Sequence, residues 1–117
     1  MLGIGIDIVQ IGRFQKLTLT SPNLVTRIFH NNELSSPIRR LAGKFSVKES
    51  VKKALGAAAM KIDFRDIIVS NQKDGAPIVS FSDNVLDIYD LHHVTFMVSL
   101  SYVSNLVVSN VVAIRSI

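Results

Sequence analysis

The chain contains no cysteine and no tryptophan, and only three of its 117 residues are proline. Without cysteine, the protein has no disulfide, no thiolate metal site and no cysteine nucleophile. Aromatic residues make up 7% of the chain, which is few for a protein that stacks the bases of a nucleic acid. The sequence has no apolar run of the roughly 20 residues that a bilayer-spanning helix requires. A membrane partner is therefore not expected.

The N-terminus lacks the basic segment of a signal peptide and reaches an acidic residue, Asp7, almost at once. We therefore expect a cytoplasmic protein. The length allows one domain, residues 1–117, and the hydrophobic content of 48% is enough for a small core. A content this high also predicts apolar surface that one copy does not hide, which favours self-association.

The charge balance is basic, with 13 Lys and Arg residues against nine Asp and Glu residues and a net charge of +4. This excess favours an anionic partner, which is a phosphorylated ligand, a nucleic acid or an acidic protein.

The first strand is predicted at residues 2–9, where aliphatic residues alternate with Gly3, Gly5 and Asp7. One face of this strand is wholly aliphatic, and the other is nearly bare and ends in a carboxylate. Two glycines weaken a strand, so they indicate that another segment approaches the backbone closely.

The other elements follow from periodicity and from turn residues. Helices are predicted at 11–17, 21–29, 36–58 and 83–90, and strands at 67–70, 77–81, 94–101 and 106–114. On the long helix, one apolar face gathers Val47, Val51, Ala54 and Ala58. The last two strands form a hairpin joined by residues 102–105, and the second of them is apolar enough to be central. This order predicts an α+β fold, with a mostly antiparallel sheet packed against one long and several short helices.

Several common motifs are excluded. Gly3-Ile4-Gly5 is not a dinucleotide fingerprint, because the third glycine would fall at Ile8 and the glycines lie inside the strand. The sequence also lacks a Walker A loop, a zinc-binding HExxH motif and a GxSxG nucleophile motif. The three histidines have no metal-ligand spacing.

Two carboxylates are candidates for chemistry. Asp7 is either a helix-cap or turn residue or a ligand for a hard cation such as Mg²⁺. Glu49 either forms an ordinary salt bridge with Lys53, four residues on, or pairs with Asp7 across a cleft. In the second arrangement, two carboxylates surrounded by lysines would hold Mg²⁺ and a phosphate together. The basic run 39–53 is either a solvated helix face or a nucleic-acid-binding surface.

These pieces together resemble the family of holo-acyl-carrier-protein synthases, the small bacterial type of 4′-phosphopantetheinyl transferase. The resemblance spans nearly the whole chain, and its specific part is the Gly-Ile-Asp strand followed about 40 residues later by the Lys-Glu helix. The matching segments are 3–9 with Arg13-Phe14, Arg27-Ile28-Phe29 with Glu33-Leu34, 41–50 with 53–56, Phe64-Arg65-Asp66-Ile67 with Gly75-Ala76-Pro77, and 98–114.

The resemblance implies the 4′-phosphopantetheinyl transferase fold and a role in fatty acid biosynthesis. The implied reaction moves 4′-phosphopantetheine from coenzyme A to a serine of apo-acyl carrier protein and releases adenosine 3′,5′-bisphosphate. It also implies a homotrimer, with the active site in a cleft between neighbouring subunits.

Residue roles are implied by motif position. Asp7 and Glu49 are Mg²⁺ ligands, and Lys53 lies near the phosphates. Glu49, or a water on the Mg²⁺, is the base that takes the proton of the carrier serine. Gly56 lies where the chain runs close to coenzyme A, and Arg13 on the first helix meets the acidic helix of the carrier protein.

Three positions depart from the family pattern. Tyr102 stands where His is usual, Lys44 where Arg is common, and Ile68 where an acidic residue is common. Lys44 keeps the positive charge but loses the two-pronged guanidinium contact to phosphate. Tyr102 at neutral pH supplies no imidazolium charge to coenzyme A. This departure motivates a second hypothesis, a catalytically weakened paralogue that binds coenzyme A or carrier protein. A basic nucleic-acid-binding domain is the third.

Overall fold

The structure is a computed structural model that describes residues 3–116. Short 3-10 helices are labelled η. The elements in chain order are β1 (Gly3–Gln10), α1 (Ile11–Thr20), α2 (Pro22–Ile28), η1 (Asn31–Glu33), α3 (Ile38–Leu55), η2 (Ala57–Lys61), η3 (Phe64–Asp66), β2 (Ile67–Asn71), β3 (Pro77–Phe81), α4 (Asp83–Ile88), β4 (Val94–Val103) and β5 (Leu106–Arg115).

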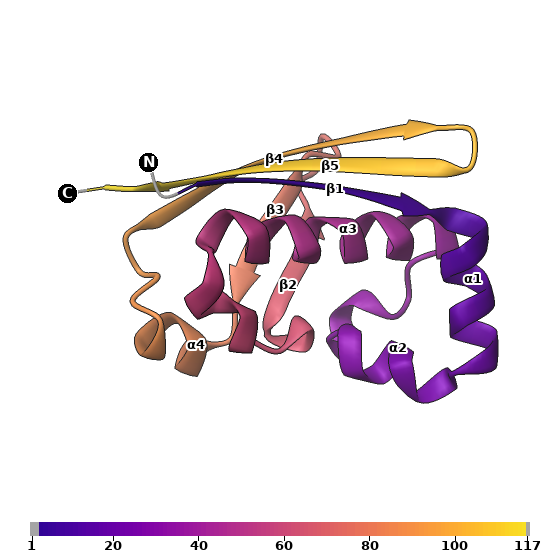
Figure 1. Cartoon of the computed structure of the whole chain (residues 1–117), viewed down its shortest axis with the longest axis horizontal. Helices are drawn as coiled ribbons and strands as arrows, with labels where there is room; N and C mark the ends of the chain where they lie inside the picture. The colour runs from indigo at the N-terminus through magenta and orange to yellow at the C-terminus, as the bar shows by residue number, and fades with distance from the viewer. Residues whose placement is uncertain (1–2, 117) are drawn as a thin grey trace.

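The strands form two antiparallel sheets, a three-stranded sheet in the order β1-β5-β4 and the separate β2-β3 hairpin. The helices all lie on one side of the three-stranded sheet, and the long helix α3 runs beneath β1 and β5 (Figure 1). The predicted α+β class and the central position of β5 are confirmed. The strands divide into two sheets because β2 and β3 pair only with each other.

Strand β1 packs directly on α3, as its glycines predict. A Cβ atom on Gly5 would collide with the carbonyl oxygen of Ser50, and one on Gly3 with that of Ala54. The isoleucine side chains of β1 face the other way and are exposed, with Ile6 58% and Ile8 63% accessible. The bare face of the strand is therefore the buried one. Leu2, the first residue of the predicted strand, lies outside the described residues.

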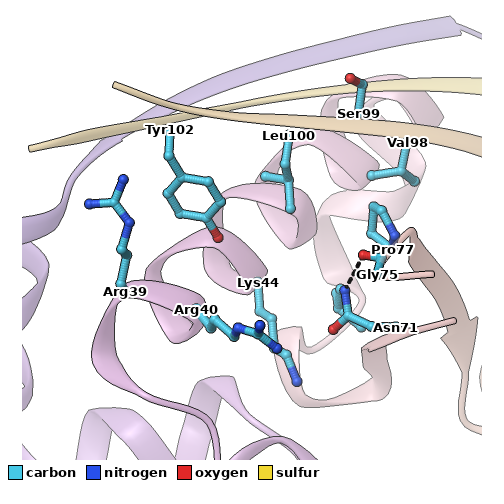
Figure 2. A pocket seen from close by; sticks show the side chains of 11 residues that line it. Arg39, Arg40, Lys44, Asn71, Gly75, Pro77, Val98, Ser99, Leu100 and Tyr102 are labelled. Carbon is cyan, nitrogen blue, oxygen red and sulfur yellow. Dashed lines mark hydrogen bonds between the residues drawn. The ribbon is translucent and has the colours of Figure 1, made fainter. Parts of the chain in front are cut away.

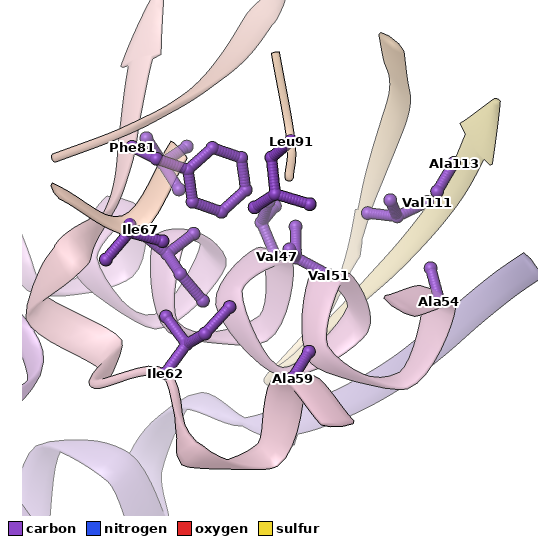
Figure 3. Packing of buried hydrophobic residues seen from close by; sticks show 12 residues of the cluster. Val47, Val51, Ala54, Ala59, Ile62, Ile67, Phe81, Leu91, Val111 and Ala113 are labelled. Carbon is purple, nitrogen blue, oxygen red and sulfur yellow. The ribbon is translucent and has the colours of Figure 1, made fainter. Parts of the chain in front are cut away.

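The main core lies between α3, the two sheets and α4 (Figure 3). Val47 and Val51 of α3 are fully buried there, and Ala54 is 3% exposed. Helix α3 ends at Leu55 instead of 58, because Gly56 takes a φ of +91° that departs from the helix. The predicted inner face of this helix is confirmed up to Ala54.

Other predicted boundaries change by a few residues. Helix α1 continues to Thr20, beyond the predicted end at Leu17. The β4-β5 loop contains only Ser104 and Asn105, so Tyr102 lies inside β4 opposite Val107 and not at the hairpin tip. Ser21 precedes Pro22 at the start of α2 as predicted, although its side chain makes no capping hydrogen bond. Among residues 3–116, no helix is both long and apolar enough to cross a membrane.

Candidate active site

The carboxylate of Asp7 lies where β1 crosses α3. Its side chain is 15% exposed, and its Oδ1 atom accepts a hydrogen bond of 3.2 Å from the Lys53 ammonium. The same ammonium donates to the carbonyl oxygen of Ile6 at 2.9 Å. Lys53 itself is half exposed, so the ion pair borders solvent and contributes little to stability.

Glu49 precedes Lys53 by one turn of α3 and is half-buried. Burial raises the pKa of the Glu49 carboxyl above its ordinary value, and the neighbouring negative charge of Asp7 raises it further. The ammonium groups of Lys53 and Lys52 oppose that rise. Two carboxylates close enough to repel one another, with cations at their border, form a site that favours an added positive charge.

The chemistry of this donor set fits Mg²⁺, which prefers carboxylate oxygens and retains several waters or phosphate oxygens as further ligands. Within residues 3–116, no three His, Cys, Asp or Glu side chains lie close enough to hold a metal together. Asp7 and Glu49 would therefore supply two ligands, and water or substrate would supply the rest.

The structure also shows which ordinary contacts of the two carboxylates are made. Lys53 forms its ion pair with Asp7, and not the ordinary helical salt bridge with Glu49. Asp7 does not cap the following helix, because Asn105 takes that role. The Asn105 side chain accepts from Gly12 N at 3.1 Å, and its carbonyl accepts from Ile11 N at 2.8 Å. Both structural alternatives are therefore absent from this fold.

Lys44 and Tyr102 lie together in a different place, a pocket of about 470 Å³ between α3, β4 and the β2-β3 hairpin (Figure 2). Arg39 and Arg40 join them there, so three cationic side chains line one pocket. The Arg39 guanidinium carbon lies 4.7 Å from the centre of the Tyr102 ring. This combination suits an anionic ligand, with charge from α3 and a hydroxyl from β4.

Burial shifts the pKa values of Lys44 and Tyr102 in this pocket. It lowers the pKa of Lys44, and the nearby Arg40 charge lowers it further, while Glu33 opposes the change. Burial raises the pKa of Tyr102, so its hydroxyl keeps its proton at neutral pH. The Tyr102 ring reaches its place because the facing residue is Gly43, where a Cβ atom would collide with the hydroxyl.

The predicted site residues therefore form two groups on one chain. Asp7, Glu49 and Lys53 gather at β1, and Lys44 and Tyr102 gather at the pocket. Lys44 and Lys53 are nine residues apart on α3, which places them about 180° apart around the helix axis. The two groups therefore lie on opposite sides of α3.

Gly56 and Arg13 lie at the two ends of the molecule's helical layer. Gly56 has a positive φ of 91°, and nothing lies within 4 Å of where its Cβ would be. This position thus requires glycine and also leaves open space for a ligand. Arg13 of α1 borders a cavity of about 310 Å³ that is lined mainly by apolar side chains, including Phe14, Leu17 and Phe45.

Sequence reasoning missed a buried ion pair behind the site. The Lys48 ammonium, which is 0% exposed, donates to Glu33 Oε1 at 2.6 Å and to the carbonyl oxygens of Ile28 and Phe64 at 2.8 and 2.9 Å. The other Glu33 oxygen accepts from Val69 N at 2.9 Å. The sequence feature that could have indicated a buried lysine is the four-residue spacing of Lys44, Lys48 and Lys52, which places all three on one face of α3. All three are buried, whereas Arg39, Arg40 and Lys53 of the same run are exposed, so the basic run 39–53 is only in part a solvated face.

A carboxylate pair beside lysines, together with a separate cationic pocket, defines a protein of the class that handles phosphate-bearing ligands. Comparison with known proteins gives the family. The model of the 4′-phosphopantetheinyl transferase superfamily matches residues 3–109. The chain belongs to this superfamily, within the group of the holo-acyl-carrier-protein synthases.

Named relatives agree with this family. A holo-[acyl-carrier-protein] synthase of Clostridium novyi is 41% identical over 70% of this chain and 64% of its own length. A synthase of the same name from Clostridium botulinum is 34% identical over 86% of each chain. A crystal structure of a Bacillus anthracis holo-(acyl-carrier-protein) synthase in complex with coenzyme A (3′,5′-ADP) has a TM-score of 0.79 at 28% identity, covering 98% of this chain and 97% of that one.

Proposed function

We propose that this chain transfers 4′-phosphopantetheine from coenzyme A to a serine of apo-acyl carrier protein, with Asp7 and Glu49 as ligands of Mg²⁺. The proposal joins membership of the family with one observation. The two carboxylates share a half-buried site in which burial and Asp7 raise the pKa of Glu49. The donor in the related Bacillus anthracis structure, coenzyme A, is the phosphate-bearing ligand that such a site would take.

The bound Mg²⁺ would neutralise charge on the pyrophosphate of coenzyme A and so make its β-phosphorus easier to attack. The carrier serine oxygen forms a bond to that phosphorus, the bond to the bridging oxygen breaks, and adenosine 3′,5′-bisphosphate leaves. Lys53 lies at the edge of the carboxylate pair, where its ammonium stabilises charge that develops on the phosphates. Glu49, a carboxylate of raised pKa, is placed to accept the serine proton.

The cationic pocket is the second part of the donor site. Lys44, Arg39 and Arg40 contribute charge, and Tyr102 contributes a hydroxyl that stays protonated. Because this pocket lies on the far side of α3 from Lys53, we assign the two halves of one coenzyme A site to neighbouring copies. Open space at Gly56 leaves room for the same ligand on the carboxylate side.

Assembly into a homotrimer would bury the uncovered face of the three-stranded sheet. Within residues 3–116, no helix covers this face (Figure 1). All three strands carry exposed apolar side chains on it. They include Ile4, Ile6, Ile8, Met97, Val103, Leu106 and Ile114. Contiguous apolar surface of this kind is typical of a subunit interface. The number of copies, three, rests on the family resemblance.

The carrier protein would dock at α1. Arg13 is placed beside an apolar cavity, which suits a helix that presents both acidic and apolar side chains. The net charge of +4 favours the same acidic partner. We place this activity in the cytoplasm, in fatty acid biosynthesis, and assign it to one domain over residues 1–117.

The test is mass spectrometry of apo-acyl carrier protein incubated with this protein, coenzyme A and Mg²⁺, beside a sample with EDTA. The proposal predicts a gain of one phosphopantetheine, about 340 Da, that EDTA abolishes. Coenzyme A binding without a mass gain would favour the weakened paralogue that Tyr102 motivates. Tyr102→His would then be the next variant to test.

A further inference from the structure

Three serine hydroxyls meet in the interior between β1, β5 and α3. Ser46 and Ser50 of α3 and Ser109 of β5 are all 0% exposed. The Ser109 hydroxyl lies 2.7 Å from that of Ser46 and 2.6 Å from that of Ser50. The Ser46 hydroxyl also donates to the backbone carbonyl of Asp7 at 3.2 Å. The cluster therefore ends on the residue that carries the first carboxylate of the candidate site.

The cluster and Lys53 hold Asp7 from two directions. Ser46 binds the backbone oxygen of Asp7, and Lys53, two helical turns further along α3, binds its side chain. Glu49 lies between these two contacts on the same face of the helix, since residues three and four apart are neighbours. Ser109 faces Asp7 directly across the β1-β5 ladder, and its hydroxyl bonds to Ser46, so the third hydroxyl joins the central strand to the side chain that binds Asp7.

Packing alone does not call for hydroxyls at these positions. A buried hydroxyl must find a hydrogen-bond partner, and alanine would fill nearly the same space without that requirement. The site has its own need for restraint, because two like-charged carboxylates on separate elements repel one another and only contacts such as those of Asp7 with Ser46 and Lys53 hold them together. Groups that orient metal ligands from behind typically change metal affinity by about 10–100-fold when they are removed.

We propose that Ser46, Ser50 and Ser109 are positioning residues that fix Asp7 of β1 against the turn of α3 that carries Glu49. The hydroxyl cluster thereby presents the two carboxylates at the separation that one divalent cation requires. This inference rests on the proposed function, because it assumes that Asp7 and Glu49 are metal ligands.

The test measures metal binding to the folded protein as well as activity. Mn²⁺ is titrated into the protein in the presence of coenzyme A and followed by electron paramagnetic resonance, for wild type, Ser46→Ala, Ser50→Ala and Ser109→Ala. We expect Ser46→Ala and Ser109→Ala to weaken Mn²⁺ binding about tenfold. Ser50→Ala should have a smaller effect, because Ser50 bonds to Ser109 but neither to Asp7 nor to Ser46, the side chain that binds Asp7. Transfer by the two weak binders should fall at limiting Mg²⁺ and recover at saturating Mg²⁺.

The control is Val51→Ala, which removes a fully buried side chain of the same helix that belongs to the hydrophobic core. It should lower thermal stability and leave Mn²⁺ affinity unchanged at temperatures where every variant is folded. If Ser109→Ala does not fold, Ser46→Ala carries the test.

The outcomes separate this inference from the function on which it rests. Wild-type Mn²⁺ affinity in Ser46→Ala and Ser109→Ala, with normal transfer by wild type, would overturn the positioning role and leave the transferase intact. Equal weakening in Val51→Ala would also overturn it, since any loss of packing would then suffice. A wild-type protein that neither binds Mn²⁺ nor transfers phosphopantetheine would remove both.

Discussion

At the scale of single residues, the repulsion between Glu49 and Asp7 destabilises the metal-free site, and a bound cation would relieve it. Its carboxyl is half-buried beside Asp7, and both burial and the Asp7 charge raise its pKa. The ionised pair is therefore unfavourable in the metal-free protein. A bound cation would relieve that repulsion, so the same arrangement that weakens the fold favours metal binding.

Glu49→Gln should accordingly stabilise the metal-free protein at neutral pH. The folded pKa of Glu49 lies above its ordinary value of 4.5, so the folded state binds more protons than the unfolded state as pH rises past that value. The free energy of unfolding of wild type thus falls with rising pH in this range, and Glu49→Gln lacks the fall. The gain should be less than about 1 kcal/mol, because water still reaches the carboxyl.

Urea unfolding in EDTA at several pH values measures this difference. Asp83→Asn is the matched control, since it removes one negative charge at an exposed position of α4. A Glu49→Gln protein less stable than wild type at neutral pH would contradict the electrostatic account of the site.

The carboxylates could be proposed from the sequence because motif spacing is a local property. The alternation around Asp7 and its distance from Glu49 are readable without a fold. The nine-residue spacing of Lys44 and Lys53 also follows from the sequence. Which of the two lysines lies beside Asp7 does not, because that depends on which side of α3 packs against β1. Tyr102 was misplaced for a related reason, since the strand pairing of β4 and β5 continues to Val103.

At the scale of elements, the buried Lys48–Glu33 pair ties α3 to the segments around it. Lys48 bonds to the carbonyls of Ile28 and Phe64, and Glu33 bonds to the backbone of His30 and Val69. Burial lowers the pKa of Lys48 to about 8, although its bond to Glu33 opposes the change. Both carboxylate oxygens of Glu33 and the ammonium of Lys48 have hydrogen-bond partners. Removal of one member would therefore leave the other buried without its counter-charge.

Lys48→Met should therefore lower the free energy of unfolding by about 3–5 kcal/mol. The double variant Glu33→Gln/Lys48→Met should lower it by less, because no lone charge remains. Urea unfolding of both variants at pH 7 measures the difference. Equal stability of wild type and Lys48→Met would contradict the assignment of this pair as a buried support of α3.

The pH dependence of the pair has a definite sign. The folded pKa of Lys48, about 8, lies below its ordinary value of 10.5, so the unfolded state binds more protons between those values. Wild-type stability should rise relative to the double variant as pH increases through this range. A fall in the same comparison would show that the lysine gains, and does not lose, proton affinity on folding.

Elements were predictable from the sequence where the pattern was strong, and their ends were not. The glycines of β1 correctly indicated a close neighbour, and the apolar stripe of α3 correctly indicated its inner face. The buried lysines were misread because charge normally faces solvent. Glu33, the ion-pair partner of Lys48, lies 15 residues before it and reaches it only through the turn at η1.

At the scale of the whole molecule, the open face of the three-stranded sheet and the divided site lead to one prediction. Ile6→Glu should abolish self-association, because it places a charge in the middle of the apolar face. Light scattering should then report 12.9 kDa, against about three times that mass for wild type. Ile88→Glu, at a position 70% exposed on α4, should leave the assembly unchanged. A wild-type protein of 12.9 kDa would contradict the shared site.

Mixing two defective variants tests the division of the site between copies. Glu49→Gln lacks one half of the proposed site, and Lys44→Ala lacks the other. Mixed trimers formed from equal amounts should recover about a quarter of the wild-type transfer rate, since that fraction of sites combines two intact halves. A transfer rate of the mixture no greater than the sum of the rates of the two separate variants would place both halves of the site on one chain.

The central claim is that the carboxylate pair of β1 and α3 carries out phosphopantetheine transfer. The most direct measurement is the mass of apo-acyl carrier protein after incubation with coenzyme A and Mg²⁺ and either wild type or folded Glu49→Gln. We predict a gain of about 340 Da with wild type and a rate at least about 100-fold lower with Glu49→Gln at every Mg²⁺ concentration. Transfer by Glu49→Gln at the wild-type rate would contradict the account.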